Sequence, residues 1–441
     1  MAVNMRSFRK NVAGLLVGQL SRLAIQAAYF VVIARMLGVS GYGAFAAALA
    51  LIALVSPFSS LGVNTLMVKN VSRRQEDGPS EWRRGLLFTV CGGIVASLAV
   101  VALGKIVLPG EVSPWAVLQL AIAELLGLKL VELVGSFWQS MGRSAALIVL
   151  PSLLNIMRLG AALIVLFWSE EVVLTDWSTW YICATVPFGL AVSLYTTVRL
   201  KAERKEYRLG ASEAREGLLY SVSLASQNVY NDIDKTMLAS LYSVSSAGVY
   251  SAAYRIIDMA YAPIRSIAAA AYPLFFREGE QGLASALRLT RKIAPAAVGI
   301  ALAAALSTLL VAPLAPAILG ADYESAVDIV RLLAPLILLR AASFLAADTL
   351  TGAGHQGFRT VAQIGIAVIN AALNVLVIPE FGILGAVITT LFCEAILGIS
   401  LWLRIWAIGS FTPELGRHGS RGRRARREGS ETSTDRTAGN R

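Results

Sequence analysis

Apolar segments of about 20 residues recur along almost the whole chain, and this pattern restricts its possible folds more than any other feature. A helix of about 20 residues spans the roughly 30 Å hydrocarbon core of a bilayer. Of the 441 residues, 56% are hydrophobic and 15% are charged, whereas about 25% are charged in soluble proteins. The sequence therefore predicts an all-α integral membrane protein.

We expect about twelve transmembrane helices, arranged in two six-helix lobes. Their boundaries follow from the apolar runs and from the charged or turn-forming residues between them. The predicted spans cover residues 12–34, 44–68, 86–104, 115–138, 145–168, 178–198, 217–240, 247–275, 294–312, 326–350, 359–378 and 384–407.

The basic residues indicate how these spans are oriented. Connections on one side hold most of the 39 Lys and Arg residues, whereas connections on the other side hold only Arg35 and Lys105. Cytoplasmic loops of membrane proteins are enriched in Lys and Arg. We therefore expect both termini in the cytoplasm. The net charge of +11 is then mainly a topology signal, and nucleic acid is not an expected partner.

An internal repeat divides the chain into halves. Residues 39–51, VSGYGAFAAALAL, match residues 244–256, VSSAGVYSAAYRI, at a shift of 205, and a second match follows at a similar shift. An even number of spans in each half makes the halves parallel and puts the substrate path between them. The expected domains are an N-terminal lobe (1–198), a basic cytoplasmic linker (199–216), a C-terminal lobe (217–407) and a basic, disordered cytoplasmic tail (408–441).

Two short motifs have enzymatic interpretations that the membrane setting weakens. GAGHQG, residues 352–357, matches a dinucleotide-binding pattern, but that site needs a strand and a soluble βαβ unit, so we predict a cytoplasmic turn. Asp232 and Asp234 resemble the D-x-D metal site of glycosyltransferases, yet no loop is long enough for a water-facing catalytic domain. We expect no metal, no cofactor and no enzymatic activity, and keep a membrane glycosyltransferase as a less favoured alternative.

The seventh predicted span is unusually polar, because QNVYNDIDKTML, residues 227–238, places three charges and three amides in an apolar stretch. Ionisable groups at membrane depth are costly and face a bundle interior or a watery cavity. At 100° per residue, Asn228, Asp232 and Lys235 share one face of this helix. The polar residues expected to line a cavity are Gln19, Gln26, Asn228 and Asn231.

Charged residues inside the spans have two interpretations. Lys129 with Glu132, and Arg255 with Asp258, have the i, i+3 spacing that suits ion pairs between side chains of one helix. Such pairs would serve only to hold helices together.

Arg22 and Arg265 have no such partner in the sequence, so we expect them to line a cavity in which an anionic ligand offsets the desolvation of the cation. Arginine suits phosphate in particular. The candidate substrate-binding cations are Arg22, Lys235, Arg255 and Arg265, and the candidates for ion coupling or charge pairing are Asp232, Asp234 and Asp258.

Three stretches resemble the polysaccharide-biosynthesis (Wzx-type, oligosaccharide) flippases, whose superfamily, MOP, also holds the MATE multidrug extruders and the lipid II flippase. They are the opening NVAGLLVGQLSRLAIQAAYFVVIARMLGVSGYGAFAAALAL, the polar NDIDKTMLASLYSVSSAGVYSAAYRI and LTGAGHQG before the eleventh span. The resemblance implies a V-shaped pair of lobes that alternates between inward-open and outward-open states. It also implies a central cationic cavity lined by the first, second, seventh and eighth spans, whose charged residues handle the sugar and its pyrophosphate.

The resulting expectation is a flippase that moves undecaprenyl-pyrophosphate-linked oligosaccharide repeat units to the outer leaflet of the cell membrane, for O-antigen, exopolysaccharide or capsule. The expected partners are this lipid-linked oligosaccharide and membrane lipids. A polysaccharide polymerase, a chain-length regulator and H⁺ or Na⁺ are further candidate partners. A MATE-like cation-coupled drug extruder is the main alternative, and it would need acids in the cavity more than arginines.

Overall fold

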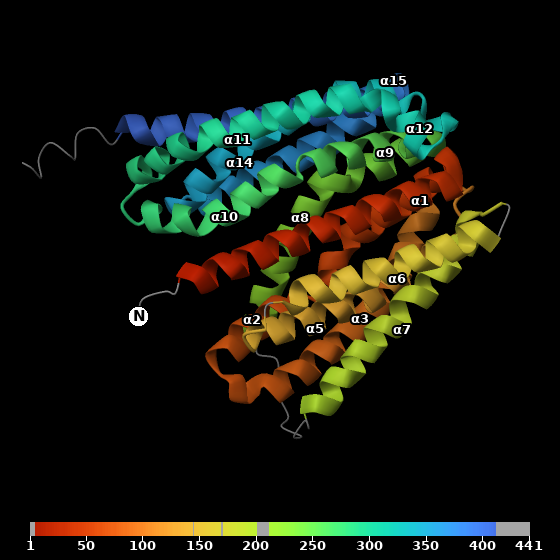
Figure 1. The fold of residues 1–441 in the computed structure, drawn as a ribbon, viewed down its shortest axis with the longest axis horizontal. Coiled ribbons are helices and arrows are strands. Elements are labelled where there is room, and N and C mark those ends of the chain that lie inside the picture. Colours follow the sequence, from red (N-terminus) through yellow and green to blue (C-terminus); the bar gives the residue numbers. More distant parts are fainter. Residues whose placement is uncertain (1–4, 144, 169–170, 201–210, 412–441) are drawn as a thin grey trace, which may run out of the picture. The chain divides into compact units, whose positions relative to one another are not determined.

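The computed structural model describes residues 5–143, 145–168, 171–200 and 211–411, and their regular elements are all helices (Figure 1). The central part of the predicted linker and the predicted tail beyond Phe411 lie outside the described residues.

Each of the twelve predicted spans coincides with one or more of the helices. In chain order the elements are α1 (Met5–Ser59), α2 (Val63–Arg73), η1 (Gln75–Asp77), α3 (Gly78–Val107), α4 (Pro114–Ile122), the π-helical turn η2 (Ala123–Leu128), α5 (Lys129–Ser140), α6 (Ala146–Trp168), α7 (Leu174–Leu200), α8 (Ala211–Leu241), α9 (Val244–Ala260), α10 (Ala262–Gly279), α11 (Leu283–Val311), η3 (Ala312–Leu314), α12 (Ala315–Leu319), η4 (Ala321–Tyr323), α13 (Ala326–Leu333), α14 (Pro335–Gly352) and α15 (Gln356–Phe411).

Six helical stretches of the described chain are long and apolar enough to cross a membrane, or seven if one bent helix pair forms a single span. Two of them, Ser21–Ser59 and Gln356–Ile408, have 39 and 53 residues, whereas about 20 suffice for one crossing. Each contains a glycine with positive φ that interrupts the helix, Gly38 (φ 63°) and Gly382 (φ 54°). Each stretch therefore holds enough helix for the two crossings predicted there.

The fourth, seventh and eighth predicted spans fall on helices that are more polar or interrupted. The fourth is divided among α4, η2 and α5, the seventh is α8, and the eighth is divided between α9 and α10 at Tyr261. The total of twelve crossings remains a prediction.

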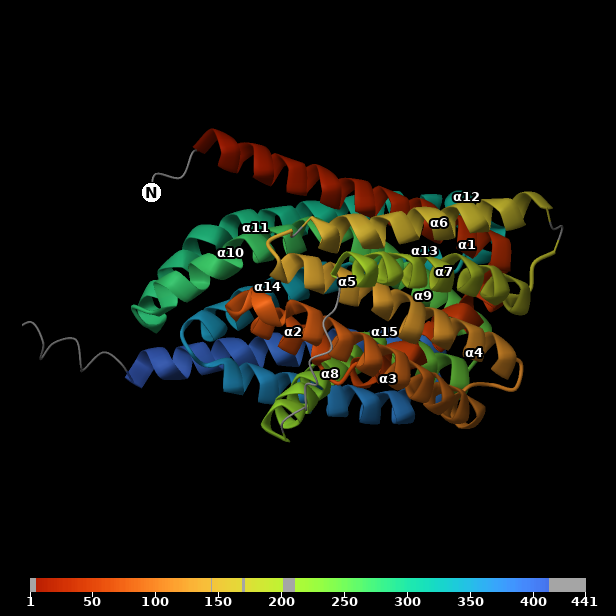
Figure 2. The same ribbon diagram turned by 90° about the horizontal axis from the view of Figure 1, so that it is seen from below.

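Contacts divide the chain into two compact units. Unit 1 comprises Met1–Ala262, Ala303–Ile337 and Gln363–Cys393, and unit 2 comprises Pro263–Leu302, Leu338–Ala362 and Glu394–Arg441. Within unit 1, α6 and α7 lie side by side in both views (Figures 1 and 2). The division into six-helix lobes remains a prediction.

The break in α1 is held by hydrogen bonds to two short elements of unit 1, η4 and α12. Where Gly38 interrupts the helix, nearby carbonyl groups need hydrogen-bond donors outside the regular helical pattern. The hydroxyl of Tyr323, in η4, donates to the carbonyls of Ala34 and Gly38, at 3.2 Å each. In return, Arg35 of α1 donates to two carbonyls of α12, at 2.5 and 2.6 Å. The bend of α1 is thus fixed by reciprocal hydrogen bonds.

The repeat-related segments of α1 and α9 meet at two glycines. A Cβ added to Gly43 would overlap the backbone of Val244 and Gly248, and a Cβ added to Gly248 would overlap the backbone of Val39 and Gly43. Val39 and Gly43 correspond to Val244 and Gly248 at the shift of 205. Each segment therefore presents the same groups to the other, as a local two-fold axis would produce. Glycines permit this close backbone approach between membrane helices.

We expect Gly43→Ala and Gly248→Ala each to destabilise the protein by roughly 1–3 kcal/mol, because the added methyl forces two backbones apart. Unfolding of the purified protein in detergent measures the effect. Gly160→Ala is the matched control, since its added methyl meets no atom within 4 Å. Equal stability of all three variants would contradict the close contact.

Candidate functional site

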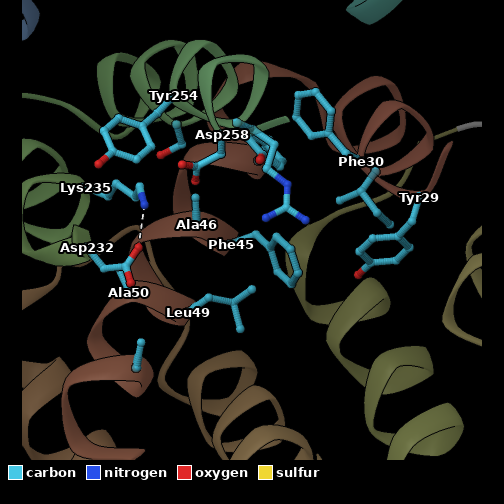
Figure 3. A pocket seen from close by; sticks show the side chains of 15 residues that line it. Tyr29, Phe30, Phe45, Ala46, Leu49, Ala50, Asp232, Lys235, Tyr254 and Asp258 are labelled. Carbon is cyan, nitrogen blue, oxygen red and sulfur yellow. Dashed lines mark hydrogen bonds and ion pairs between the residues drawn. The ribbon is translucent and has the colours of Figure 1, made fainter. Parts of the chain in front are cut away.

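A cavity of about 290 Å³ lies in unit 1, lined by residues of α1, α8 and α9 (Figure 3). These helices contain the first and seventh predicted spans, most of the second and the beginning of the eighth. The aromatic lining residues are Tyr29, Phe30, Tyr42, Phe45 and Tyr254, and the polar ones are Asp232, Lys235, Ser251, Arg255 and Asp258.

The aromatic wall comes mainly from α1 and depends on the break at Gly38. Tyr29 and Phe30 precede the break, whereas Tyr42 and Phe45 follow it. Across the break, the ring centroids of Phe30 and Tyr42 are 5.6 Å apart. Beyond Tyr42 the lining residues recur at three- and four-residue intervals, so they form one face of the helix. A single bent helix therefore supplies two sides of the cavity.

Helix α8 is fastened to α1 on either side of Asp232. The amide of Asn228 donates to the carbonyl of Ala53 at 2.7 Å, and the hydroxyl of Thr236 donates to the carbonyl of Ala47 at 3.1 Å. Asp232 lies four residues from each donor and hence on the same face of α8. Asn228, which the sequence predicts in the cavity lining, instead joins the two helices beside it.

Asp232 and Lys235 form an ion pair at the edge of the cavity, with Nζ of Lys235 2.5 Å from Oδ1 of Asp232. The same ammonium group lies 4.6 Å from the centre of the Tyr254 ring and 3.4 Å from the carbonyl of Asn231. Figure 3 shows Lys235, Asp232 and Tyr254 on one side of the cavity and Tyr29 on the other. In this conformation the Lys235 charge is compensated by protein groups.

Helix α9 contributes one polar face to the cavity. Ser251, Tyr254, Arg255 and Asp258 follow each other at intervals of three, one and three residues, which puts all four side chains on the same side of the helix. Arg255 and Asp258 thus both line the cavity.

The described lining carries no net formal charge, because Lys235 and Arg255 are balanced by Asp232 and Asp258. The sequence predicts a cationic cavity. The lining differs from this prediction because two of the predicted arginines, Arg22 and Arg265, are not part of it. Arg22 is half-buried on α1 and is not among the residues that line this cavity. Arg265 is exposed on α10, in unit 2.

The remaining predicted cavity residues lie on α1 and α8. Gln26 is half-buried on α1 outside the lining, and the side chain of Gln19 lies outside the described residues. Asn231 is half-buried, and its contact with Lys235 runs through its backbone carbonyl.

Asp234 faces away from this cavity into a separate buried cluster. Its Oδ2 accepts a hydrogen bond from Tyr250 at 2.5 Å, and its Oδ1 accepts one from the backbone N–H of Lys235 at 2.8 Å. The Tyr250 hydroxyl also lies 3.0 Å from that of Thr390, on α15. Asp232 and Asp234 therefore belong to different environments, whereas a D-x-D metal site needs both carboxylates at one ion.

Two hydroxyl groups in the lining lack a hydrogen-bond partner among the described residues, those of Tyr29 and Ser251. Both oxygen atoms are buried, and Ser251 is only 4% exposed. Sequence reasoning did not single them out, because isolated serines and tyrosines in apolar spans have many ordinary roles. The available signal was positional: Ser251 lies four residues before Arg255, on the same face of α9.

Several other intramembrane charges form pairs, as the alternative interpretation predicts. Lys129 contacts Glu132 at 2.8 Å. Arg158 contacts Glu124, on the π-helical turn η2, at 2.7 Å, and Tyr181 donates to the same carboxylate at 2.5 Å. Buried ion pairs with extra hydrogen bonds can hold helices together without a ligand. Among the described residues, no cluster of three or more His, Cys, Asp or Glu side chains is placed to hold a metal ion.

Comparisons with known proteins give a family match and a fold. Residues 8–278 match the family model described as "Polysaccharide biosynthesis protein". A comparison with curated protein sequences found no match.

Solved structures of similar fold include an inward-facing multidrug resistance MATE family transporter of the MOP superfamily, with 16% identity, a TM-score of 0.66 and coverage of 89% of this chain and 99% of that chain. The lipid II flippase MurJ, in an inward closed conformation, is 12% identical, with a TM-score of 0.68 over 89% of this chain and 87% of that chain. The fold is therefore that of a multi-pass, all-helical integral membrane protein.

A double-mutant cycle tests the ion pair of the cavity. We expect Asp232→Asn and Lys235→Met each to destabilise the protein, since either leaves an uncompensated charge in a partly buried part of α8. The double variant should be destabilised less than the sum, with a coupling of roughly 0.5–3 kcal/mol in reversible unfolding from mixed micelles.

The control pair is Asp328 with Arg331, which has the same i, i+3 spacing but is largely exposed. Its coupling should stay near the ~0–1 kcal/mol of surface ion pairs. Equal coupling in the two cycles would contradict a buried role for Asp232 and Lys235.

Proposed function

Because this chain belongs to the polysaccharide biosynthesis protein family and has the fold of the MATE transporter and of MurJ, we propose that it is a lipid-linked oligosaccharide flippase. The proposed substrate is an undecaprenyl-pyrophosphate-linked repeat unit, moved from the cytoplasmic to the outer leaflet of the cell membrane. The observation that carries the proposal is a polar cavity bearing four charged side chains, lined by helices that the sequence predicts to span the membrane. Charged groups at membrane depth mark substrate pathways.

The proposed mechanism is alternating access, in which the headgroup crosses through the polar cavity while the prenyl chain stays in lipid. With the N-terminus in the cytoplasm, the break of α1 and the contact of Gly43 with Gly248 lie toward the outer leaflet. This contact, and the hydrogen bonds of Tyr323 and Arg35, close that end in the present conformation. Opening to the outer side requires α1 and α9 to separate there.

Two arginines of unit 1, Arg255 and Arg22, are the proposed contacts of the substrate. Arg255 lines the cavity, where its guanidinium can donate to the headgroup. Arg22 lies on the same helix as Tyr29, seven residues toward the proposed cytoplasmic end, or roughly 10 Å along the axis. It is the proposed contact of the pyrophosphate. Arg265, on α10 of unit 2, is a third candidate, because it is positively charged and lies inside the eighth predicted span.

Asp234 is the proposed coupling residue for H⁺ or Na⁺. It is 3% exposed, so its carboxylate is far from bulk water, and its neighbours Tyr250 and Thr390 supply hydroxyl groups from two other helical segments. Binding of a cation there would change the contacts that join α8 to α9 and α15. Asp232 and Asp258 line the substrate cavity instead, where substrate and ion can compete for them.

We expect Arg22→Ala, Arg255→Ala and Arg265→Ala each to reduce surface polysaccharide about tenfold or more at matched protein level, since a hydrogen bond to a charged group contributes roughly 1.5–3 kcal/mol. Lipid-linked repeat units should accumulate in the same cells. Arg255→Lys should restore function only in part, because lysine lacks the planar guanidinium.

Arg331→Ala is the control for this series, because Arg331 is exposed and forms an ion pair only at the surface of α13. It should leave polysaccharide export unchanged. Full function in all three variants would refute the role of these cations, and drug efflux without any change in polysaccharide would favour an extruder.

The coupling role of Asp234 predicts that Asp234→Asn uncouples translocation from its driving gradient, because the amide keeps the size of the carboxylate but carries no charge. In vesicles loaded with lipid-linked oligosaccharide, an imposed pH or Na⁺ gradient should no longer change the fraction that an added lectin reaches. Asp328→Asn, at an exposed carboxylate, should respond like the wild type. A full gradient response of the Asp234 variant would rule out this residue as the coupling site.

A further inference from the structure

The two hydroxyl groups without partners point to a ligand in the cavity of unit 1. Buried polar groups in folded proteins are almost always hydrogen-bonded, so an exception needs a specific explanation. Serines in helices commonly donate to a carbonyl one turn earlier, as Ser97 does to Gly93 and Ser221 to Gly217. Ser251 makes no such bond, although it is buried and lines the cavity. Its hydroxyl, like that of Tyr29, therefore has no hydrogen-bond partner among the described residues, although each residue lines the cavity.

The charge balance of the lining argues against an anion as that group. Lys235 already contacts Asp232, and both Asp232 and Asp258 face the cavity. A pyrophosphate in the same space would bring its negative charges close to two carboxylates, in surroundings that screen charge weakly. The cavity therefore disfavours the most strongly charged part of the proposed substrate.

The remaining chemistry of the lining suits an uncharged sugar. Sugar rings present apolar C–H groups on their faces, which pack against aromatic rings, and hydroxyl groups around their edges, which need donors and acceptors. Five aromatic side chains line the cavity, together with two unpartnered hydroxyls, two carboxylates and a guanidinium. The volume of about 290 Å³ is near the lower limit of small-molecule sites, roughly 300–1,000 Å³, so it suits part of an oligosaccharide rather than all of it.

We infer that this cavity is a subsite for one uncharged sugar ring of the transported headgroup, recognised through the hydroxyls of Tyr29 and Ser251, and that the pyrophosphate binds outside it. The inference rests on the proposed flippase function and specifies which part of the substrate the cavity holds. It also assigns a role to two residues that carry no charge and that a search for arginines and carboxylates passes over.

The test measures binding of methyl β-D-glucoside, methyl β-D-galactoside, methyl β-D-glucuronide and sodium pyrophosphate to the full-length protein in nanodiscs, by saturation-transfer NMR. We expect at least one neutral glycoside to bind, the glucuronide to bind more weakly, and pyrophosphate not to displace the glycoside. Ser251→Ala and Tyr29→Phe should each weaken glycoside binding about 3- to 10-fold, since each removes one hydrogen bond.

Ser193→Ala is the matched control, because Ser193 is also 4% exposed, lies in a helix and has a hydroxyl without a hydrogen-bond partner among the described residues, but is not part of the cavity lining. It should bind the glycoside like the wild type. Only variants whose unfolding midpoint equals that of the wild type are compared, so that a loss of binding cannot be caused by a loss of folded protein. Absence of glycoside binding, displacement by pyrophosphate, or an equal effect of Ser193→Ala and Ser251→Ala would each overturn the inference.

A second measurement separates this inference from the flippase proposal. Deletion of the gene should abolish surface polysaccharide, whether or not the cavity binds a sugar. If deletion abolishes polysaccharide but no glycoside binds, the sugar subsite is wrong and the flippase proposal stands. If a glycoside binds as described but deletion leaves polysaccharide unchanged, the flippase proposal fails and the sugar site remains.

Discussion

Many polar groups inside the helices of this protein are held by other protein groups, because the bilayer core offers no hydrogen-bonding solvent. The break of α1 illustrates the constraint: Tyr323 and Arg35 supply the hydrogen bonds that the interrupted helix and the end of α12 need. Glu124 and Arg158 satisfy each other, as do Lys235 and Asp232. Two residues whose buried hydroxyls lack a partner among the described residues, Tyr29 and Ser251, line the same cavity.

The cavity is lined by aromatic and polar side chains and lies within a fold similar to that of the MATE transporter and of MurJ. Its aromatic side chains come from both sides of the bend in α1, so its shape depends on the backbone conformation at Gly38. Its polar side chains come from α8 and α9, and hydrogen bonds from Asn228 and Thr236 fasten α8 to α1. Movement of α1 relative to α9 would therefore alter the cavity and the contact of Gly43 with Gly248 together. This geometric link is what alternating access requires of a substrate site.

Much of the fold was accessible from hydropathy and basic residues alone. The positions of the helices follow from runs of apolar residues, and the paired helices within α1 and α15 were separated correctly because turn-forming residues interrupt each run. The i, i+3 rule found the contact of Lys129 with Glu132, and helical periodicity put Lys235 on the same face as Asp232, since both depend on only one helix. The same rule could not tell that Asp234 meets Tyr250 and Thr390, because Thr390 is 156 residues away in the chain.

The sequence by itself determined that the chain is a helical membrane protein, which residues share a helical face and which family it resembles, because periodicity and hydrophobicity are local properties. Only the tertiary structure decided which of the charged faces meet. It put Arg255 and Asp258 in one cavity with Asp232 and Lys235, left Arg22 outside the lining, and thereby changed a predicted cationic cavity into one without net charge. Charge balance and unpartnered hydroxyls depend on how separate helices pack, and packing is not encoded in the spacing along any one of them.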